Sequence, residues 1–242
     1  MSKESYLNET YPGISGGLNL KVTIVIPSYN EEKNISDIIT KIKSNYENIL
    51  VVDSKKSKDR TAEVAKKAGA VVIKDGGKGK GEALRRAIRH VDDGIIVFID
   101  SDGSHATEDI PKLIKPIQEG RADMVVASRM LGGSDELHGT LLNFIKTTGT
   151  GLIQLFINYR WRVELTDSEN GFRAIKADVA KKLKLKANDF DIEQEMVMKA
   201  LKKNFRVSEI ASHEYPRKYG KAKLKLMKCG WKFAWRLFRD IW

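Results

Sequence analysis

The chain has 242 residues, of which 41% are hydrophobic, and it carries a formal net charge of +11 at pH 7. This length suits one α/β domain, and the single cysteine, Cys229, excludes a framework of internal disulfides and is typical of a reducing compartment. No stretch reaches the roughly 18 apolar residues that span a bilayer, and residues 1–20, which we expect to form a polar tail, lack the apolar core of a signal peptide. We therefore expect a soluble or peripherally attached protein.

Apolar runs and helical segments alternate through the first half of the chain. The runs lie at residues 21–27, 48–53, 70–75, 94–100 and 122–129. Helical periodicity separates them near residues 31–44, 59–68, 82–91 and 109–119. Continuous apolar strands that alternate with helices predict an α/β fold, in which a mostly parallel sheet is covered by helices on both faces.

The second half has a less regular pattern. A polar, Gly-rich loop at residues 130–140 precedes a helical stretch at 141–159, which could pack in the core or lie at a membrane interface. Three further segments follow at residues 172–183, 192–204 and 205–215, and no linker or internal repeat separates them. We therefore expect one domain over residues 21–223.

Acidic side chains follow the predicted strands where a parallel sheet binds its ligands, beyond the strands' carboxyl ends. Asp53 ends the second run, and Asp100 and Asp102 follow the fourth with a single residue between them. Two carboxylates with this spacing can direct their oxygens toward one hard cation, Mg²⁺ or Mn²⁺, whose usual companion is a diphosphate. The alternative is that Asp100 caps the next turn and Asp102 is a solvated loop acid.

Four segments around these acids carry a family resemblance. They are PSYNEEKNI (27–35), VVDSKKSKDRT (51–61), GGKGKGEALRRAI (76–88) and ADMVVASR (122–129). In this order and spacing they resemble the nucleotide-sugar half of the family 2 inverting glycosyltransferases. The resemblance extends over about residues 20 to 225 and implies the GT-A fold, a Rossmann-like, mostly parallel sheet. Ser54 and Lys55 depart from it, because the family usually has Asp and Gly there.

The second half resembles one branch of that family, the polyprenyl-phosphate hexose synthases, which use dolichyl phosphate and similar lipids. The matching segments are DSENGFRAI (167–175), FDIEQEM (190–196) and RKYGKAKL (217–224). The resemblance implies a donor half (21–129), an acceptor half (130–223), and transfer of a hexose from UDP- or GDP-hexose to a polyprenyl or dolichyl phosphate. With the single cysteine and the missing apolar span, we expect a cytoplasmic protein attached peripherally to the cytoplasmic face of a membrane. Residues 168–170 depart from the usual proline, threonine and serine.

Carried over position by position, the resemblance implies a role for each matching residue. The nucleotide-sugar would be bound by Pro27, Tyr29, Glu31, Asp53, Lys78, Lys80, Asp100, Ser101 and Asp102. Asp100 and Asp102 would also hold Mg²⁺ or Mn²⁺, with Ser104 where some relatives have a glutamine ligand. The acceptor would be bound by Arg129, Lys146, Asn170, Arg173, Arg217, Lys218 and Lys223. The catalytic residues would be Asp102, through the metal, and Arg129, Arg217 and Lys223, through the phosphates of donor and acceptor.

Ordinary structural roles are the alternative for several of these residues. Tyr29 could simply pack at a strand end, Lys78 and Lys80 could be solvated loop charges, and Arg173 could pair with Asp167 or Glu169. We expect His105 and His138 to lie at the surface and His213 to be structural.

Residues 224–242 predict a basic amphipathic helix. At helical spacing, one face carries Met227, Trp231, Trp235, Phe238 and Trp242, and the other carries Lys225, Lys228, Lys232, Arg236 and Arg239. Aromatic residues opposite cations are typical of a helix in the headgroup layer of a membrane. The alternative is an amphipathic helix docked on the domain. Nine basic residues and one acid lie between Arg217 and Trp242, so most of the excess charge is at this end.

Two other functions fit parts of the pattern. A glycosyltransferase acting on a soluble or glycan hydroxyl would need a carboxylate base, for which Asp167, Glu169 and Asp191 are candidates. A non-catalytic nucleic-acid-binding module would use the basic tail. We do not expect nucleic acid as a partner, because the aromatic residues of the tail gather on one face, as a membrane surface requires.

Overall fold

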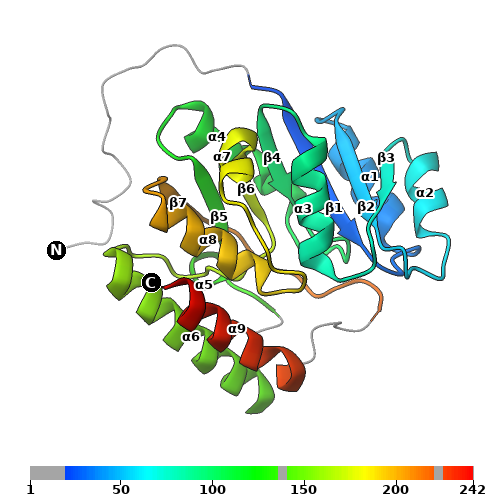
Figure 1. Ribbon diagram of the computed structural model, residues 1–242. Coiled ribbons are helices and arrows are strands. Elements are labelled where there is room, and N and C mark those ends of the chain that lie inside the picture. Colours follow the sequence, from blue (N-terminus) through cyan, green and yellow to red (C-terminus); the bar gives the residue numbers. More distant parts are fainter. Residues whose placement is uncertain (1–19, 136–140, 221–225, 242) are drawn as a thin grey trace.

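The computed structural model describes residues 20–135, 141–220 and 226–241, and the side chains of all of these except 141–147 and 226–231. The described residues do not include Lys223, Lys225, His138, Trp242 or the polar tail at 1–19, nor the side chains of Lys146, Met227, Lys228 and Trp231. The polypeptide forms a layered α/β structure, with a helical layer beside it (Figure 1).

The described residues form a mixed sheet of seven strands in the order β3-β2-β1-β4-β6-β5-β7. The strands are β1 (Val22–Ser28), β2 (Ile49–Asp53), β3 (Val71–Lys74), β4 (Ile95–Phe98), β5 (Met124–Ser128), β6 (Arg173–Lys176) and β7 (Val207–Ala211). All neighbouring pairs are parallel except those of β6, which is antiparallel to both β4 and β5. The predicted mostly parallel sheet is confirmed, and β1 to β5 coincide with the five apolar runs.

Helices cover both faces of this sheet. They are α1 (Ile35–Lys43), α2 (Thr61–Lys67), α3 (Lys80–His90), α4 (Ile110–Gln118), α5 (Arg129–Gly132), α7 (Ala177–Lys182) and α8 (Ile192–Lys202), with a 3₁₀ turn, η1 (Thr107–Asp109), before α4. One core cluster joins the sheet to α3, α7 and α8, and a second joins it to α1 and α4. The isoleucines predicted to share one face of α1 are all buried in the second cluster.

Two further helices, α6 (Leu141–Trp161) and α9 (Leu226–Asp240), lie side by side outside the sheet and pack on α8 (Figure 1). The outer surface of α6 exposes Leu152, Leu155, Phe156 and Tyr159. Within the described part of the chain, no helix combines the length and the apolar character needed to cross a membrane.

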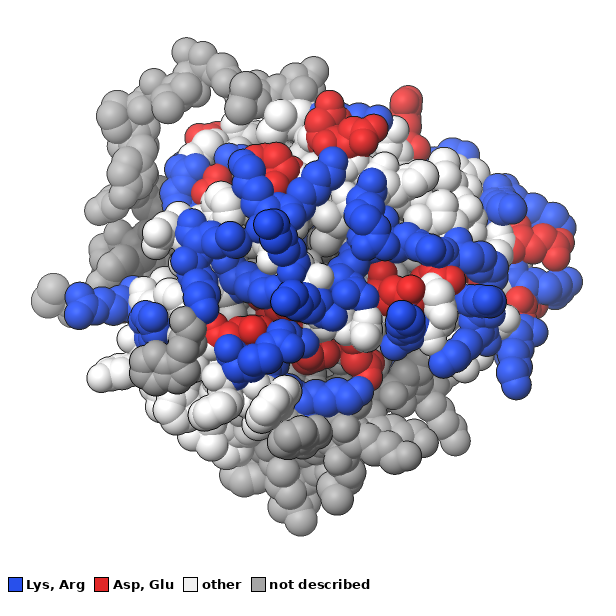
Figure 2. All heavy atoms as spheres, viewed as in Figure 1, with Lys and Arg blue, Asp and Glu red and all other residues white. Residues whose placement is uncertain are grey.

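Two cations of α9 pair with acids of the domain, as expected for the alternative of a docked helix. Lys and Arg side chains also gather over much of the face shown in Figure 2. The Arg236 guanidinium is buried against Asp191, and Lys232 Nζ lies 2.6 Å from Asp189 Oδ2. Trp235 and Phe238 remain 49% and 69% exposed. The helix is thus docked through ion pairs, which periodicity could not reveal because the partner acids lie more than 40 residues earlier in the chain.

Candidate active site

The carboxyl ends of β1 and β2 build a polar floor around Asp53. Its side chain is fully buried, accepts hydrogen bonds from Ser57 Oγ at 2.7 Å and Ser28 Oγ at 3.2 Å, and lies 2.5 Å from Lys74 Nζ. Pro27 is buried in β1 and pairs in register with Val52. Asp53 is therefore a fixed acceptor at the edge where the nucleotide was predicted to bind.

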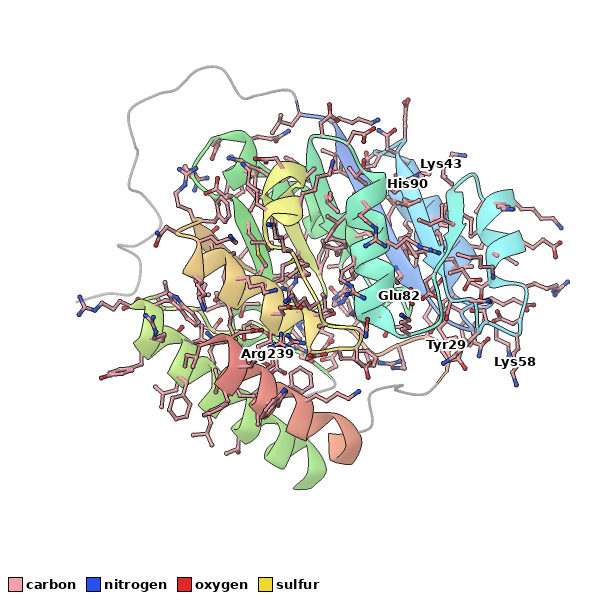
Figure 3. The ribbon with its side chains drawn as sticks, in the orientation of Figure 1. Tyr29, Lys43, Lys58, Glu82, His90 and Arg239 are labelled. Carbon is pink, nitrogen blue, oxygen red and sulfur yellow. The ribbon has the colours of Figure 1, made fainter. Side chains whose placement is uncertain are left out.

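The surroundings of this floor hold the other residues expected to contact the nucleotide. The Glu31 carboxylate is buried and accepts a hydrogen bond from Asn34 Nδ2 at 2.6 Å. Tyr29 is exposed at the same end of the domain as Glu82 (Figure 3). Lys78 is exposed and its backbone N–H donates to Glu82 Oε2 at 2.9 Å, so its ammonium group lies on the surface.

Lys80, at the first position of α3, bridges two acids beside β4. Its Nζ lies 2.5 Å from Asp100 Oδ1 and 2.8 Å from Glu193 Oε1, and the other oxygen of Asp100 lies 3.5 Å from His105 Nε2. Gly171 backs this group, since a Cβ there would lie 2.7 Å from both Lys80 Nζ and Asp100 Oδ2. Position 171 therefore has no room for a side chain and requires glycine.

Burial and ion pairing set the protonation of this cluster. Burial alone would raise the pKa of Asp100, but Lys80 and His105 hold it well below its usual range. Burial raises the pKa of Glu193 despite the same lysine, and both of its oxygens lack a hydrogen-bond partner that meets ordinary geometry. Asp100 is therefore ionised at neutral pH.

Asp102 lies on the open side of the cluster and faces a cation from the acceptor half. One of its oxygens accepts from Ser104 Oγ at 2.8 Å and from the Ser104 backbone N–H at 3.1 Å. Its other oxygen lies 3.2 Å from an Arg217 Nη atom. Ser101, between the two acids, is buried.

The donor set of Asp100 and Asp102 fits a magnesium or manganese ion. The described residues contain no group of three or more His, Cys, Asp or Glu side chains that could enclose a metal. A hard cation with only one or two protein carboxylates is typical of nucleotide sites, where substrate phosphates and waters supply the remaining oxygen ligands. Asp100 pairs with Lys80 and Asp102 pairs with Arg217, so both carboxylates already face positive charge. A bound divalent ion would replace part of that charge.

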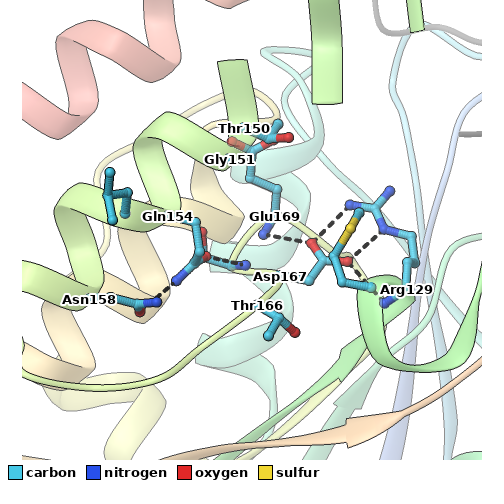
Figure 4. Close-up of a pocket in the computed structure, with 11 residues that line it drawn as sticks. Arg129, Thr150, Gly151, Gln154, Asn158, Thr166, Asp167 and Glu169 are labelled. Carbon is cyan, nitrogen blue, oxygen red and sulfur yellow. Dashed lines mark hydrogen bonds and ion pairs between the residues drawn. The ribbon is translucent and has the colours of Figure 1, made fainter. Parts of the chain in front are cut away.

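A second polar group surrounds Arg129, which follows β5. Its Nε and one Nη atom donate to the two oxygens of Asp167 at 2.7 and 2.9 Å, and its other Nη atom lies 3.7 Å from Glu214 Oε1. Although burial alone would lower the pKa of Arg129, these acids raise it, so the guanidinium stays charged. A pocket of about 320 Å³ lies beside this pair, between α6 and residues 166–169 (Figure 4).

The lining of this pocket combines polar and apolar groups. Arg129, Thr166, Asp167, Ser168 and Glu169 form one wall. Met130 and residues of α6 form the other, namely Thr150, Gly151, Gln154, Leu155 and Asn158. Leu155 also belongs to the exposed apolar surface of α6, so the pocket adjoins that surface.

Three residues predicted to bind the acceptor lie elsewhere. Arg173 is completely buried, and its guanidinium donates to the backbone carbonyls of Ser168, Asn170 and Glu193, so it braces the chain and pairs with neither Asp167 nor Glu169. Asn170 is buried and its Oδ1 accepts from the Phe172 N–H at 3.0 Å. Lys218 lies 2.8 Å from Asp37 of α1 and is exposed.

Several residues near the sites were missed or misplaced by the sequence analysis. His105 was expected at the surface but is buried, stacked on Phe172 and beside Asp100. His213 binds Asp135 and the Gly132 carbonyl, in keeping with the structural role expected of it. Glu193 could have been suspected from its place in FDIEQEM, whereas nothing local marks Glu209, whose contacts come from residues over 40 positions away.

Comparison with known proteins supports the relationship that these sites suggest. The model of the family described as "Glycosyl transferase family 2" matches residues 23–184. The chain is 30% identical over 217 residues to the low-salt glycan biosynthesis hexosyltransferase Agl6 of Haloferax volcanii, an alignment covering 87% of this chain and 51% of that protein. The chain thus spans about half the length of this relative.

Two further relatives have names that mention a lipid phosphate. A UDP-N-acetylglucosamine–dolichyl-phosphate N-acetylglucosaminyltransferase of Methanococcus voltae is 28% identical, covering 89% of this chain and 94% of its own. A dolichol-phosphate mannosyltransferase of Pyrococcus furiosus is also 28% identical, covering 85% of this chain and 60% of its own.

Solved structures agree on the fold. Glucosyl-3-phosphoglycerate synthase from Mycobacterium tuberculosis, crystallised with Mn²⁺, UDP and phosphoglyceric acid, superposes with a TM-score of 0.74 at 20% identity, covering 92% of this chain and 79% of that one. A form of that enzyme with Mg²⁺ and UDP gives a TM-score of 0.72 at 19% identity, covering 92% and 80%. The chain is therefore a member of glycosyl transferase family 2, with the GT-A fold that its sequence predicted.

Proposed function

We propose that this protein transfers a hexose from a nucleoside-diphosphate sugar to the phosphate of a polyprenyl or dolichyl lipid, with inversion at the anomeric carbon. The observation that carries the proposal is the Arg129 pocket, where a buried cation able to hold a phosphate adjoins the exposed apolar surface of α6. A lipid phosphate combines these two chemistries. The names of the Methanococcus and Pyrococcus relatives point to the same class of acceptor.

The donor would lie over the ends of β1, β2 and β4. Asp53 and Glu31 offer buried carboxylates to the base and ribose, with Pro27 and Tyr29 beside them. Asp100 and Asp102 would hold Mg²⁺ or Mn²⁺, which when bound neutralises charge on the departing nucleoside diphosphate. The metal and UDP in the solved relatives support this arrangement, while the choice between UDP- and GDP-hexose stays open.

The protein's own task in the transfer is to bring two anions together. Arg217 beside Asp102 and Arg129 on the acceptor side would hold the phosphates so that their charges do not repel. A phosphate monoester is already anionic near neutral pH, so no general base is obligatory. Lys223 and Lys146 are proposed to add positive charge on the acceptor side. Lys78 and Lys218 would bind phosphate only after leaving their surface positions.

A hydroxyl acceptor has less support. Two of the three candidate bases, Asp167 and Asp191, are each held by an arginine, Arg129 and Arg236 respectively, and the third, Glu169, lines the Arg129 pocket. Such pairing holds the pKa of Asp167 below its usual value even though burial would raise it, which makes this carboxylate a weak base.

Peripheral attachment to a membrane is part of the proposal. Trp235 and Phe238 of α9 and the apolar side chains of α6 are exposed on neighbouring helices. Aromatic and aliphatic side chains of this kind bind at the boundary between headgroups and acyl chains. The proposed place of action is the cytoplasmic face, where nucleotide sugars would meet the lipid acceptor.

The donor site is tested by thermal shift with UDP and GDP, each with and without Mn²⁺. We expect one nucleotide to raise the melting temperature only with metal, and Asp102→Ala to abolish that rise. Asp93→Ala, which removes an exposed acid in the loop between α3 and β4, is the matched control and should respond like the parent protein. An unchanged response in Asp102→Ala would refute the metal assignment.

The acceptor is tested by incubating the full chain with radiolabelled sugar nucleotide, Mn²⁺ and polyprenyl phosphate in phospholipid vesicles. We expect label in the organic-extractable lipid, and about a hundredfold less of it with Arg129→Gln, since a lost charge-assisted contact to phosphate is worth about 3 kcal/mol. Label that stays in the aqueous phase, on a soluble acceptor, would contradict the proposal.

A further inference from the structure

Helix α6 presents different chemistry on its two sides. Leu152, Leu155, Phe156 and Tyr159 point outward and are exposed. Gln154 and Asn158, one turn apart, point inward, and Gln154 is 7% exposed. Buried amide side chains need hydrogen-bond partners, and here the partners lie in the segment that carries Asp167.

The two amides connect α6 to residues 165–168 through hydrogen bonds on both sides of Asp167. Figure 4 shows Gln154 and Asn158 bonded to each other beside this segment. Gln154 Oε1 accepts from the Ser168 N–H at 2.9 Å, and its Nε2 donates to Asn158 Oδ1 at 3.0 Å. Asn158 Nδ2 donates to the Leu165 carbonyl at 2.8 Å, and its Oδ1 accepts from the Leu165 N–H at 3.1 Å. The backbone on both sides of Asp167 is thus fixed to the helix.

The sheet holds the same segment from the opposite side. Glu209 of β7 accepts from the backbone N–H groups of Thr166 and Asp167, both at 2.7 Å. Asp167 is therefore set between a strand of the central sheet and a helix that lies outside it. Its carboxylate in turn accepts hydrogen bonds from Nε and one Nη atom of Arg129.

We propose that Gln154 and Asn158 are positioning residues, which hold Asp167 and through it orient the Arg129 guanidinium toward the incoming acceptor phosphate. This inference rests on the proposed function for the identity of the phosphate, but the link from α6 to Arg129 is a property of the protein alone. Helix α6 also exposes the apolar surface proposed to meet the lipid. The position of α6 on the membrane would therefore determine the position of the Arg129 guanidinium.

The link is tested first without any substrate, in the ¹⁵N–¹H spectrum of the arginine side chains. The Nε–H signal of Arg129 is identified by its disappearance in Arg129→Gln. In Gln154→Met, which keeps the side-chain volume but removes both hydrogen bonds, we expect this signal to shift and its exchange with water to quicken about tenfold. Gln118→Met, the same change at the end of α4, should leave it unaltered.

A second variant keeps the inference falsifiable if Gln154→Met does not fold. Asn158→Asp retains the acceptor for the Leu165 N–H but loses the donor to the Leu165 carbonyl, so a smaller change in the same direction is expected. An Arg129 signal that is identical in the parent and in every folded variant of the two amides would overturn the inference.

Kinetics with vesicle-borne polyprenyl phosphate then separate positioning from a general structural role. Gln154→Met should raise KM for the lipid about tenfold and leave KM for the sugar nucleotide unchanged. Combined with Arg129→Gln it should add less than about twofold, since residues that act through one another are not additive. Full additivity would overturn the inference, whereas a parent protein inactive on this lipid would refute only the proposed function, because the spectroscopic result does not depend on it.

Discussion

Replacing Arg236 with methionine tests whether α9 is a docked part of the domain. The Arg236 side chain is 6% exposed, and it pairs with Asp191, with Glu195 at 3.3 Å and with Asp240 at 3.1 Å. Removing one partner of a buried ion pair typically costs about 3–5 kcal/mol. We expect about 3 kcal/mol, the lower value, because Glu195 keeps a second cation, Lys199 Nζ at 2.7 Å.

The free energy of unfolding in urea at pH 7 measures this loss. Lys232→Met, one turn away on the same helix, is the matched control: its pair with Asp189 is 45% exposed on the lysine side and should be worth less than about 1 kcal/mol. Adding Asp191→Asn to Arg236→Met should recover part of the stability by removing a buried unpaired charge. Equal small effects of Arg236→Met and Lys232→Met would show that the ion pairs do not hold α9 on the domain.

Two further predictions concern packing and pH. Gly171→Ala should lower Mn²⁺-dependent nucleotide affinity about tenfold, because its new methyl group would displace the Asp100 carboxylate. Gly149→Ala, whose methyl group would contact none of the described residues, should change stability by about 1 kcal/mol at most and leave nucleotide binding intact, as isothermal titration can establish. Asp135 raises the pKa of His213, so the contribution of this pair to stability is present below about pH 6.5 and is lost as pH rises through the folded pKa. The parent protein and His213→Gln should therefore differ more in urea midpoint at pH 6 than at pH 8.5. A difference that grows with pH would contradict this pH dependence.

Residues that follow strands were predictable from sequence, because the end of an apolar run locates the edge of a parallel sheet. Asp53, Asp100 and Asp102 were found in this way. Arg173 was not, since nothing in a local pattern distinguishes an arginine at the surface from one whose donors are satisfied by three buried carbonyls. Prediction ends where a side chain's partner comes from a distant segment.

The tail illustrates the same limit for a whole helix. Its periodicity placed Trp235 and Phe238 on the face opposite Arg236, and these two aromatic side chains are exposed whereas Arg236 is buried. The pattern could not tell which side meets the protein, because that depends on where Asp189, Asp191 and Glu195 are placed by the fold of α8.

The antiparallel strand β6 fixes the distance between β4 and β5. Because β6 lies between β4 and β5, the carboxylates that follow β4 and the guanidinium that follows β5 start from strands two spacings apart, about 10 Å. This strand spacing would separate the proposed donor site from the proposed acceptor site, and it is fixed by backbone hydrogen bonds of β6 to both neighbours rather than by flexible side chains.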